Sequence, residues 1–258
     1  MYLAKSIAAS GLRNQQLRID TIANNIANAN TTAFKNARLD FKDSLYTAGI
    51  TPGPPRSPDE NQQKGHGVIA TAVTRDFKPG GLERTERMLD FAIENEGFFS
   101  LSDENGDIVY TRNGSFHLSV EAGGTFLVNG EGLYVLDNNG ARIQVPFGTD
   151  RIGTDQDGNL IFVNNDDIVG GATLGLFTFR NLKGLASSGN GNYSATAASG
   201  EILAPANAVV RQGVLEGSNI NMAEEMTRVI RTQRAFQLVS RALTTADEMQ
   251  GIANNMRR

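Results

Sequence analysis

Residues 12–29 read LRNQQLRIDTIANNIANA, and the apolar residues of this stretch return at every seventh position. Two rows of the repeat lie three residues apart, with Leu12, Ile19 and Ile26 in the first row and Gln15, Ile22 and Ala29 in the second. This spacing is typical of a helix that packs along a seam against another helix. We therefore expect a helix over residues 1–30, with a seam formed by Leu12, Ile19, Ile22 and Ile26.

The other end of the chain, residues 217–258, has a comparable pattern. Asn221 followed by Glu224 is typical of a helix start, because an Asn side chain accepts hydrogen bonds from the backbone N–H groups of the first turn. An apolar stripe follows, built mostly from steps of three and four residues. The stripe residues expected in the helix seam are Met222, Met226, Val229, Phe236, Val239 and Leu243. The sequence thus predicts a second long helix.

Between the two helical ends the sequence changes character. Residues 51–58 read TPGPPRSP, which is incompatible with a helix or an inner strand and predicts an extended loop. From about residue 66 to 204, short β-type runs alternate with turn signals such as Asn113-Gly114 and Asn129-Gly130. Asn-Gly pairs between such runs are typical of β-hairpins, so this region is expected to be antiparallel β-structure.

These patterns predict an α+β fold in which an antiparallel all-β domain is inserted between N- and C-terminal α-helices that pair as a coiled-coil-like bundle. The expected limits are residues 1–45 with 205–258 for the helical assembly domain, 46–65 for a Pro-rich linker and 66–204 for the β domain.

The apolar seams admit two arrangements. An isolated helix of this length is unstable in water unless its seam is covered. The two helices can cover each other within one molecule, packed on the β domain. Alternatively, the helix pair offers its outer apolar surface to further copies, and contacts that do not close a ring then build a helical filament or tube. The pattern alone leaves both arrangements open.

The composition limits the classes of protein to consider. The chain has 258 residues, of which 40% are hydrophobic, and no Cys, which excludes disulfides and thiolate metal sites. No run of about 18 apolar residues is present, so no membrane insertion is expected. The net charge is −4, and the basic residues at both ends are spread singly, without a patch of aromatic residues. We therefore expect no nucleic-acid partner.

Residues that carry chemistry are sparse. His66 and His117 have no His or Cys at metal-ligand spacing. The loops that begin at Asp103 and Asp155 are similar to the start of a calcium-binding loop. Both lack the Gly and the Glu that an EF-hand needs at positions six and twelve, and hairpin turns explain them better. We predict no catalytic residue, no metal site and no cofactor, and a protein that is not an enzyme.

Three blocks of the sequence are distinctive. The first is IANNIANANTTAFK at residues 22–35. The second runs from DFAI at 90–93 through GFF at 97–99 to YTRNGSF at 110–116. The third runs from GVLEGSNIN at 213–221 through TQRAF at 232–236 to DEM at 247–249. In their order and position, these blocks resemble the flagellar basal-body rod and hook family, and the stretches that they mark cover about half of the chain.

The resemblance implies a structural subunit of the bacterial flagellar basal-body rod, which polymerises into the hollow axial shaft that transmits torque for motility. It implies as partners copies of the same chain in a helical homo-oligomer, other rod and hook subunits, and the flagellar export apparatus. Family members are exported without a cleaved signal peptide, which implies an extracytoplasmic place in the basal body. The start of this sequence is accordingly unlike a secretory signal.

The resemblance also marks signature residues. They are Asn24, Asn25, Asn28, Thr32, Phe34, Lys35, Ser218, Asn219, Asn221, Gln233 and Arg234. For Asn24, Asn25 and Asn28 we expect polar contacts that fix the register between subunits.

Within the family, a middle region that holds one β domain is similar to the distal rod subunit. The alternatives are the proximal rod paralogue and a hook-type subunit. The stretch between Leu45 and Gly67 is shorter than the corresponding segment of many distal rod subunits, and this segment helps to distinguish rod from hook. A secreted enzyme acting on cell-wall glycan is the alternative from another class, but no acid–base pair of carboxylates stands apart from the surface charge.

Overall fold

The computed structural model describes residues 2–44, 46–48, 63–155, 158–165, 167–205 and 208–256. Its helices are α1 (Tyr2–Ala27), the short 3-10 helix η1 (Leu182–Gly184) and α2 (Met222–Asn255). Its strands are β1 (Ala37–Asp43), β2 (Tyr46–Ala48), β3 (Gln63–Gly65), β4 (Val68–Arg75), β5 (Leu82–Arg84), β6 (Phe91–Ile93), β7 (Phe98–Ser102), β8 (Ile108–Thr111), β9 (Phe116–Glu121), β10 (Gly124–Asn129), β11 (Tyr134–Val135), β12 (Gln144–Val145), β13 (Arg151–Thr154), β14 (Leu160–Asn164), β15 (Asp167–Ala172), β16 (Leu176–Phe179), β17 (Ala186–Gly189), β18 (Asn192–Ser194), β19 (Ile202–Leu203), β20 (Val210–Gln212) and β21 (Val214–Glu216). None of the helices in the described ranges is long and apolar enough to cross a membrane.

The chain forms two compact units. The helical unit comprises Met1–Ala27, Ala37–Asp76 and Asn221–Arg258, and the β unit comprises Asn28–Asn36 and Phe77–Ile220. The chain therefore passes four times between the units. The expected start of a β domain at residue 66 differs from this grouping, because β4 pairs with β1 and both strands belong to the helical unit.

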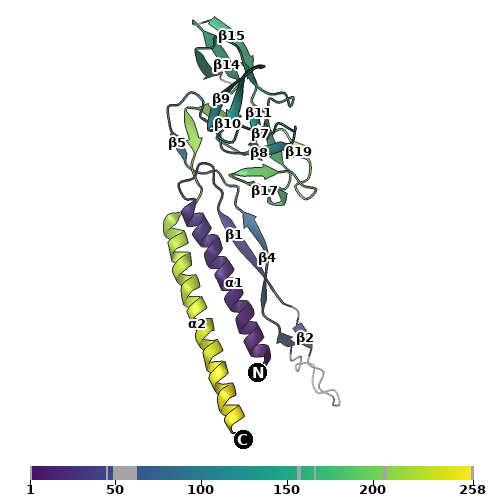
Figure 1. Ribbon diagram of the computed structural model, residues 1–258, viewed down its shortest axis with the longest axis vertical. Coiled ribbons are helices and arrows are strands. Elements are labelled where there is room, and N and C mark those ends of the chain that lie inside the picture. The colour runs from purple at the N-terminus through teal and green to yellow at the C-terminus, as the bar shows by residue number, and fades with distance from the viewer. Residues whose placement is uncertain are drawn as a thin grey trace. The chain divides into compact units, whose positions relative to one another are not determined.

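The two long helices of the helical unit run antiparallel (Figure 1). Along α1, Lys5 forms an ion pair with Asp247, and Asn25 donates a hydrogen bond to Glu225 over 3.4 Å. Between them, a Cβ built on Gly11 would lie 3.8 Å from a methyl group of Val239. As the residue number increases along α1, the number of the facing residue on α2 decreases, which confirms the antiparallel pairing. The predicted α+β fold with paired terminal helices is confirmed.

The two predicted helix boundaries have local causes. The side chain of Asn221 accepts hydrogen bonds from the backbone N–H groups of Ala223 and Glu224, at 3.1 and 3.3 Å, so α2 begins as expected from the sequence. Helix α1 ends at Ala27, and the carbonyl of Asn28 accepts a hydrogen bond from the N–H of Thr31 in the turn that follows.

A β-hairpin completes the described part of the helical unit. Strands β1 and β4 pair antiparallel, and the side-chain amide of Asn14 in α1 donates a hydrogen bond to the carbonyl of Val68 in β4. Further out, β2 pairs with β3. The outer parts of the predicted 46–65 linker are therefore strands, while residues 49–62, with most of the Pro-rich stretch, lie outside the described residues.

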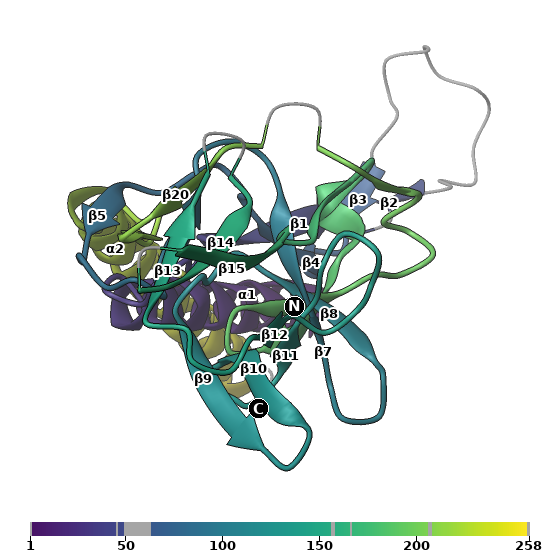
Figure 2. The same ribbon diagram turned by 90° about the horizontal axis from the view of Figure 1, so that it is seen from above.

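The β unit is built from antiparallel sheets, and Figure 2 shows their strands from above. In the largest sheet β12, β10, β11, β7, β8, β18 and β17 are neighbours in this order. Strand β9 pairs with β10, β16 pairs with β7, and β19 pairs with β16. Strands β13, β14 and β15 form a separate sheet, and β20–β6 and β21–β5 are two-stranded pairs. The main core contains Phe91, Phe99, Leu101, Phe116, Leu127 and Phe162, all at most 2% exposed.

The two Asn-Gly signals have different outcomes. Asn129-Gly130 lies in the turn between β10 and β11, which pair, as predicted. Asn113-Gly114 connects β8 to β9, which pair with other strands and do not form a hairpin. Gly114 is required there for another reason. Its carbonyl accepts a hydrogen bond from the N–H of Phe91, and a Cβ at this position would collide with the carbonyl oxygen of Phe91.

A second, aromatic cluster is centred on Phe98 and Tyr193. The two rings lie edge to face with their centroids 5.9 Å apart, and Phe77, Tyr110 and Phe179 pack around them. Burial raises the pKa of Tyr110 in this cluster above its ordinary value. On β11, the hydrogen bond that Tyr134 donates to Glu121 raises the pKa of Tyr134.

Candidate assembly surfaces and a buried ionic cluster

Most residues predicted for the helix seam are buried or half-buried, and their place between α1 and α2 stays a prediction. Ile22 is 5% exposed, and Leu12, Ile19, Ile26, Val229, Phe236, Val239 and Leu243 are half-buried. Met222 and Met226, also predicted for the seam, are exposed in the single chain. The inward positions of α2 follow steps of four and three residues from Glu225 through Val229 to Thr232, so two polar residues occupy seam positions that an apolar pattern does not select.

The outer surface of α2 is unusually apolar for a surface helix. Its exposed large apolar residues are Met222, Met226, Ile230, Leu238, Met249, Ile252 and Met256. Single exposed apolar residues are ordinary, but a series along one long helix is typical of a surface that another molecule covers. The helix pair thus covers one seam within the molecule and leaves a second apolar surface uncovered in the single chain. A role of these residues in assembly stays a prediction.

The signature residue Asn25 is part of an internal lock. Its side-chain amide accepts a hydrogen bond from the N–H of Ala37 at 3.0 Å and donates one to the carbonyl of Ala37 at 2.8 Å. It also donates to Glu225, which receives a hydrogen bond from Arg228 at 2.7 Å. Asn25 is only 1% exposed. The expected contact of Asn25 with a neighbouring subunit is therefore corrected: its amide is used inside the chain. For Asn24, which is exposed, and Asn28 that role stays a prediction.

Replacing Asn25 with Ala is expected to destabilise the helical unit by about 2–3 kcal/mol. The substitution leaves the N–H and C=O groups of the buried Ala37 without their partner, and each unsatisfied group costs about 1–3 kcal/mol. Hydrogen exchange of the α1 and β1 amides measures the loss. Asn24→Ala on the exposed side of the same turn is the matched control, with an expected change below about 1 kcal/mol. Equal losses in the two variants would contradict the lock.

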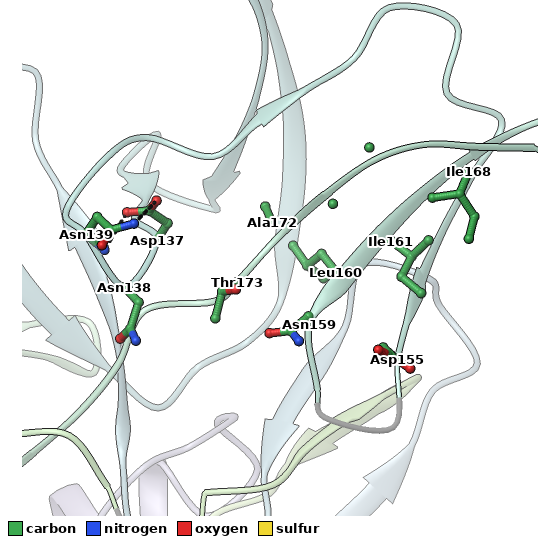
Figure 3. Close-up of a pocket in the computed structure, with 12 residues that line it drawn as sticks. Asp137, Asn138, Asn139, Asp155, Asn159, Leu160, Ile161, Ile168, Ala172 and Thr173 are labelled. Carbon is green, nitrogen blue, oxygen red and sulfur yellow. Dashed lines mark hydrogen bonds between the residues drawn. The ribbon is translucent and has the colours of Figure 1, made fainter.

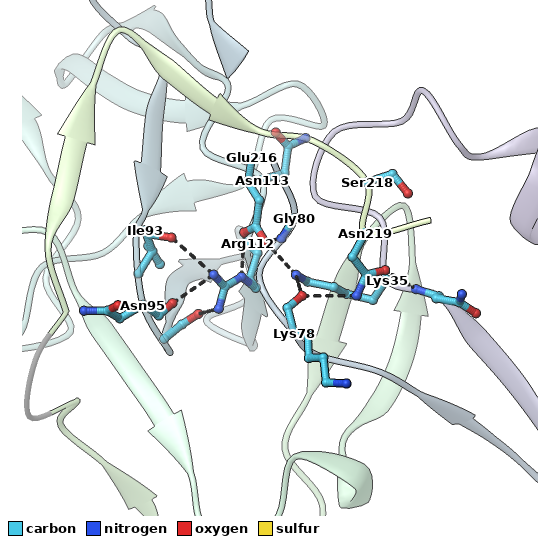
Figure 4. Close-up of polar contacts among 12 residues, drawn as sticks. Lys35, Lys78, Gly80, Ile93, Asn95, Arg112, Asn113, Glu216, Ser218 and Asn219 are labelled. Atoms are coloured by element: carbon cyan, nitrogen blue, oxygen red, sulfur yellow. Dashed lines mark hydrogen bonds and ion pairs between the residues drawn. The ribbon is translucent and has the colours of Figure 1, made fainter. Parts of the chain in front are cut away.

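The β unit contains a buried ionic cluster of Lys35, Arg112 and Glu216 (Figure 4). The carboxylate of Glu216 accepts hydrogen bonds from the ammonium of Lys35 at 2.6 Å, from Nε of Arg112 at 2.6 Å and from the backbone N–H of Gly80 at 2.7 Å. The three charged side chains are at most 2% exposed. Two cations and one carboxylate leave one net positive charge in the interior, which is stable only when every donor has a partner.

The remaining donors of the cluster are satisfied by backbone carbonyl groups. Arg112 donates to the carbonyls of Gly97 at 3.0 Å, Asn95 at 2.9 Å and Ile93 at 3.2 Å. Lys35 donates to the carbonyl of Lys78 at 2.7 Å. The guanidinium therefore fixes the loop that follows β6, and the ammonium fixes the segment that leads out of the helical unit at residue 77.

The same cluster ties together the segments at all four passages of the chain between the units. Asn219 accepts a hydrogen bond from the N–H of Asn36 at 2.7 Å and donates one to the carbonyl of Lys78 at 3.1 Å. The N–H of Ala33 donates to the carbonyl of Glu216 at 2.7 Å. Residues 28–36, 77–81 and 213–220 are thus joined side by side within the β unit. The signature residues Lys35 and Asn219 act here as internal ties.

The other signature residues have varied surroundings. Thr32, Phe34 and Ser218 are half-buried, whereas Gln233 and Arg234 are exposed on α2. Their part in assembly stays a prediction. Sequence reasoning missed Arg112 and Glu216 as site residues, although both lie in the quoted blocks. A buried charge and a surface charge look alike in a sequence, and only the three-dimensional pairing separates them.

An open pocket of about 660 Å³ lies in the β unit near one of the calcium-like loops (Figure 3). Asp137, Asp155 and Asn159 contribute to its lining. The carboxylate of Asp137 accepts hydrogen bonds from the N–H groups of Asn139 and Ala141, and the N–H of Asp155 donates to the carbonyl of Asn159, which are contacts of hairpin turns. Asp157, in the middle of that loop, lies outside the described residues. No group of three or more metal-ligating side chains is found among the residues that the structure describes.

Three regions of the chain match known protein families. Residues 6–35 match the family described as Flagella basal body rod protein, and residues 92–162 match the Flagellar hook protein FlgE/F/G D1 domain. Residues 211–256 match the Flagellar basal body rod FlgEFG protein C-terminal family. The chain belongs to the flagellar basal-body rod and hook family.

Individual relatives cover nearly the whole chain. The flagellar basal-body rod protein FlgG of Borreliella burgdorferi is 37% identical over 97% of both chains. FlgG of Agrobacterium fabrum is 34% identical over 97% of this chain and 98% of its own. The flagellar hook-basal body complex protein FlhP of Bacillus subtilis is 31% identical over 99% of this chain and all of its own. The chain is a structural subunit of the flagellar rod that assembles with other rod and hook subunits.

The ionic cluster takes one residue from each matched region. Lys35 lies in the first region, Arg112 in the second and Glu216 in the third. The three sequence blocks that identify the family are therefore joined in space by one carboxylate with its two cations.

Proposed function

We propose that this chain is a distal rod subunit that polymerises with copies of itself, through the outer face of its helix pair, into the hollow axial shaft that transmits torque. The similarity to FlgG over nearly the full length supports the distal position. The observation that carries the polymerisation is the series of exposed apolar residues along α2, because a chain that remained single would leave this surface in water.

The proposal includes export across the cell envelope by the flagellar export apparatus and a final place outside the cytoplasm. We infer that export retains the amino-terminal helix. Lys5 near the start of α1 pairs with Asp247, and Gly11 approaches Val239, so this helix is an integral half of the folded pair. The proposal also assigns no catalytic activity to the chain, in line with the structural role of its relatives.

The proposed function is tested with an epitope-tagged copy in a strain that lacks the native gene. We expect motility to return and the tag to decorate the rod of purified basal bodies in electron micrographs. Purified protein is expected to form tubes at raised concentration and to release no soluble fragments from peptidoglycan. A tag found only in the cytoplasm, or release of glycan fragments above that by a heat-inactivated sample, would overturn the respective part.

A further inference from the structure

A pocket of about 200 Å³ opens in the helical unit where α1, β1 and the start of α2 meet. Ile22, Leu39 and Phe41 give it an apolar lining. Its charged lining residues are the basic Arg18, Arg38 and Arg228 and the acidic Glu225. A cavity of about 150 Å³ lined by apolar side chains accommodates a benzene molecule. The pocket therefore has room for one large apolar side chain, with cations beside it.

The basic groups of the pocket differ in whether they already form an ion pair within the chain. Arg38 pairs with Asp40 at 3.0 Å, and Arg228 pairs with Glu224 and Glu225. Arg18 is exposed and forms no ion pair with any described residue. A partner that presents an apolar side chain and a nearby carboxylate matches this combination.

The far end of α2 carries that combination of groups. Helix α2 has 34 residues and α1 has 26, and Lys5 of α1 already pairs with Asp247. The last turns of α2 therefore extend beyond the start of α1, as Figure 1 shows within the helix pair.

Three apolar side chains near this end of α2 follow one another at steps of three and four residues, so they share one face of the helix. Ile252 and Met256 lie on the overhang, and Met249 lies just before it, opposite the start of α1. Met249 is 57% exposed, Ile252 is 58% exposed and Met256 is 79% exposed. Glu248, next to Met249, is exposed as well, and the last turn of α2 has no basic residue. Arg257 and Arg258 follow in the sequence, outside the described residues, and their charge has the same sign as the arginines of the pocket. The fit of this end of α2 to the pocket therefore rests mainly on its apolar stripe.

We propose that the pocket at the start of α2 receives the overhanging end of α2 from a second copy of the chain. Ile252 and its stripe enter the apolar lining, and Glu248 meets Arg18. The inference rests on the proposed polymerisation and names the contact that performs it. The inserted end and the receiving pocket lie at opposite ends of α2. The contact is therefore heterologous and can repeat from copy to copy without closing a ring.

The chain has no Cys, which permits a direct test by crosslinking. Thr21→Cys places a thiol at the pocket in one batch of protein, and Ile252→Cys places a thiol on the stripe in a second batch with a different tag. The batches are mixed, assembled and treated with a short bismaleimide. We expect a crosslinked dimer that carries both tags. Leu238→Cys, exposed in the middle of α2, replaces Ile252→Cys in the matched control and should give no such dimer.

The outcomes separate this contact from the proposed function. Polymers that form normally but crosslink Thr21→Cys to Leu238→Cys, or to neither position, would overturn the contact and leave polymerisation intact. Failure of the unsubstituted chain to polymerise would overturn both. A charge exchange gives a second measurement: Arg18→Glu should raise the concentration needed for assembly up to about fivefold, and adding Glu248→Arg should restore it. Absence of this rescue would count against the pairing of Glu248 with Arg18.

Discussion

Glu216→Gln is expected to lower the free energy of unfolding of the β unit by about 3–5 kcal/mol, the usual cost of breaking a buried ion pair on one side. The substitution keeps the shape of the side chain but removes the carboxylate that accepts hydrogen bonds from both Lys35 and Arg112. Both cations are at most 2% exposed, so two unneutralised positive charges would remain in the interior. Urea unfolding followed by the near-ultraviolet circular dichroism of tyrosine measures the loss.

The charge balance predicts an order among the variants. Lys35→Met leaves Arg112 paired with Glu216 and reduces the buried net charge from one to zero, so its loss should be smaller, about 1–3 kcal/mol for the broken hydrogen bonds. The double variant Lys35→Met with Glu216→Gln holds only Arg112 as a buried cation, so the buried net charge of the cluster is one, as in the natural chain. We expect the double variant to lose less than the sum of the two single losses.

A matched control for the cluster is Glu83→Gln on β5, the strand that pairs with the strand of Glu216. Glu83 is exposed, and its substitution is expected to change the stability by less than about 0.5 kcal/mol. Strictly additive losses of Lys35→Met and Glu216→Gln, or a control as damaging as Glu216→Gln, would contradict the assignment of the cluster as a coupled unit.

The sequence predicted the features that depend on periodicity. The heptad rows around Ile22, the Asn221 helix start and the turn at Asn129-Gly130 are local patterns, and local patterns determine helices and tight turns. The limits of the β domain were harder to predict from the sequence. Strand β1 lies directly after the family signature, and only its pairing with β4 about thirty residues later shows that both strands belong with the helices.

The sequence pattern did not predict two groups of buried polar residues. Thr232 and Glu225 occupy seam positions, where an apolar template rejects them. Lys35, Arg112 and Glu216 read as surface charges, because their burial depends on partners that lie 104 and 181 positions apart. Family resemblance marked Lys35 as distinctive, and the structure adds its physical reason.

Phe236→Asp is expected to separate the two long helices and abolish rod assembly while the β unit remains folded. Phe236 lies at a seam position of α2, and the substitution both removes apolar contact and places a charge in the seam, at a cost of about 3–5 kcal/mol. Hydrogen exchange should show loss of protection in α1 and α2 with unchanged protection in β7 and β8. Tube formation and motility should be lost together.

Leu238→Asp, two residues further along the same helix, distinguishes the role of the outer face from that of the inner seam. Leu238 is 65% exposed, so the charge stays in water and the helix pair should keep its protection. If the outer face of α2 is covered in the rod, this variant should fold normally and yet assemble poorly, because a charge would then be buried between subunits. Normal assembly of Leu238→Asp would exclude Leu238 from the assembly surface. Normal assembly of Phe236→Asp would overturn the view that the paired helices are the form of the chain that polymerises.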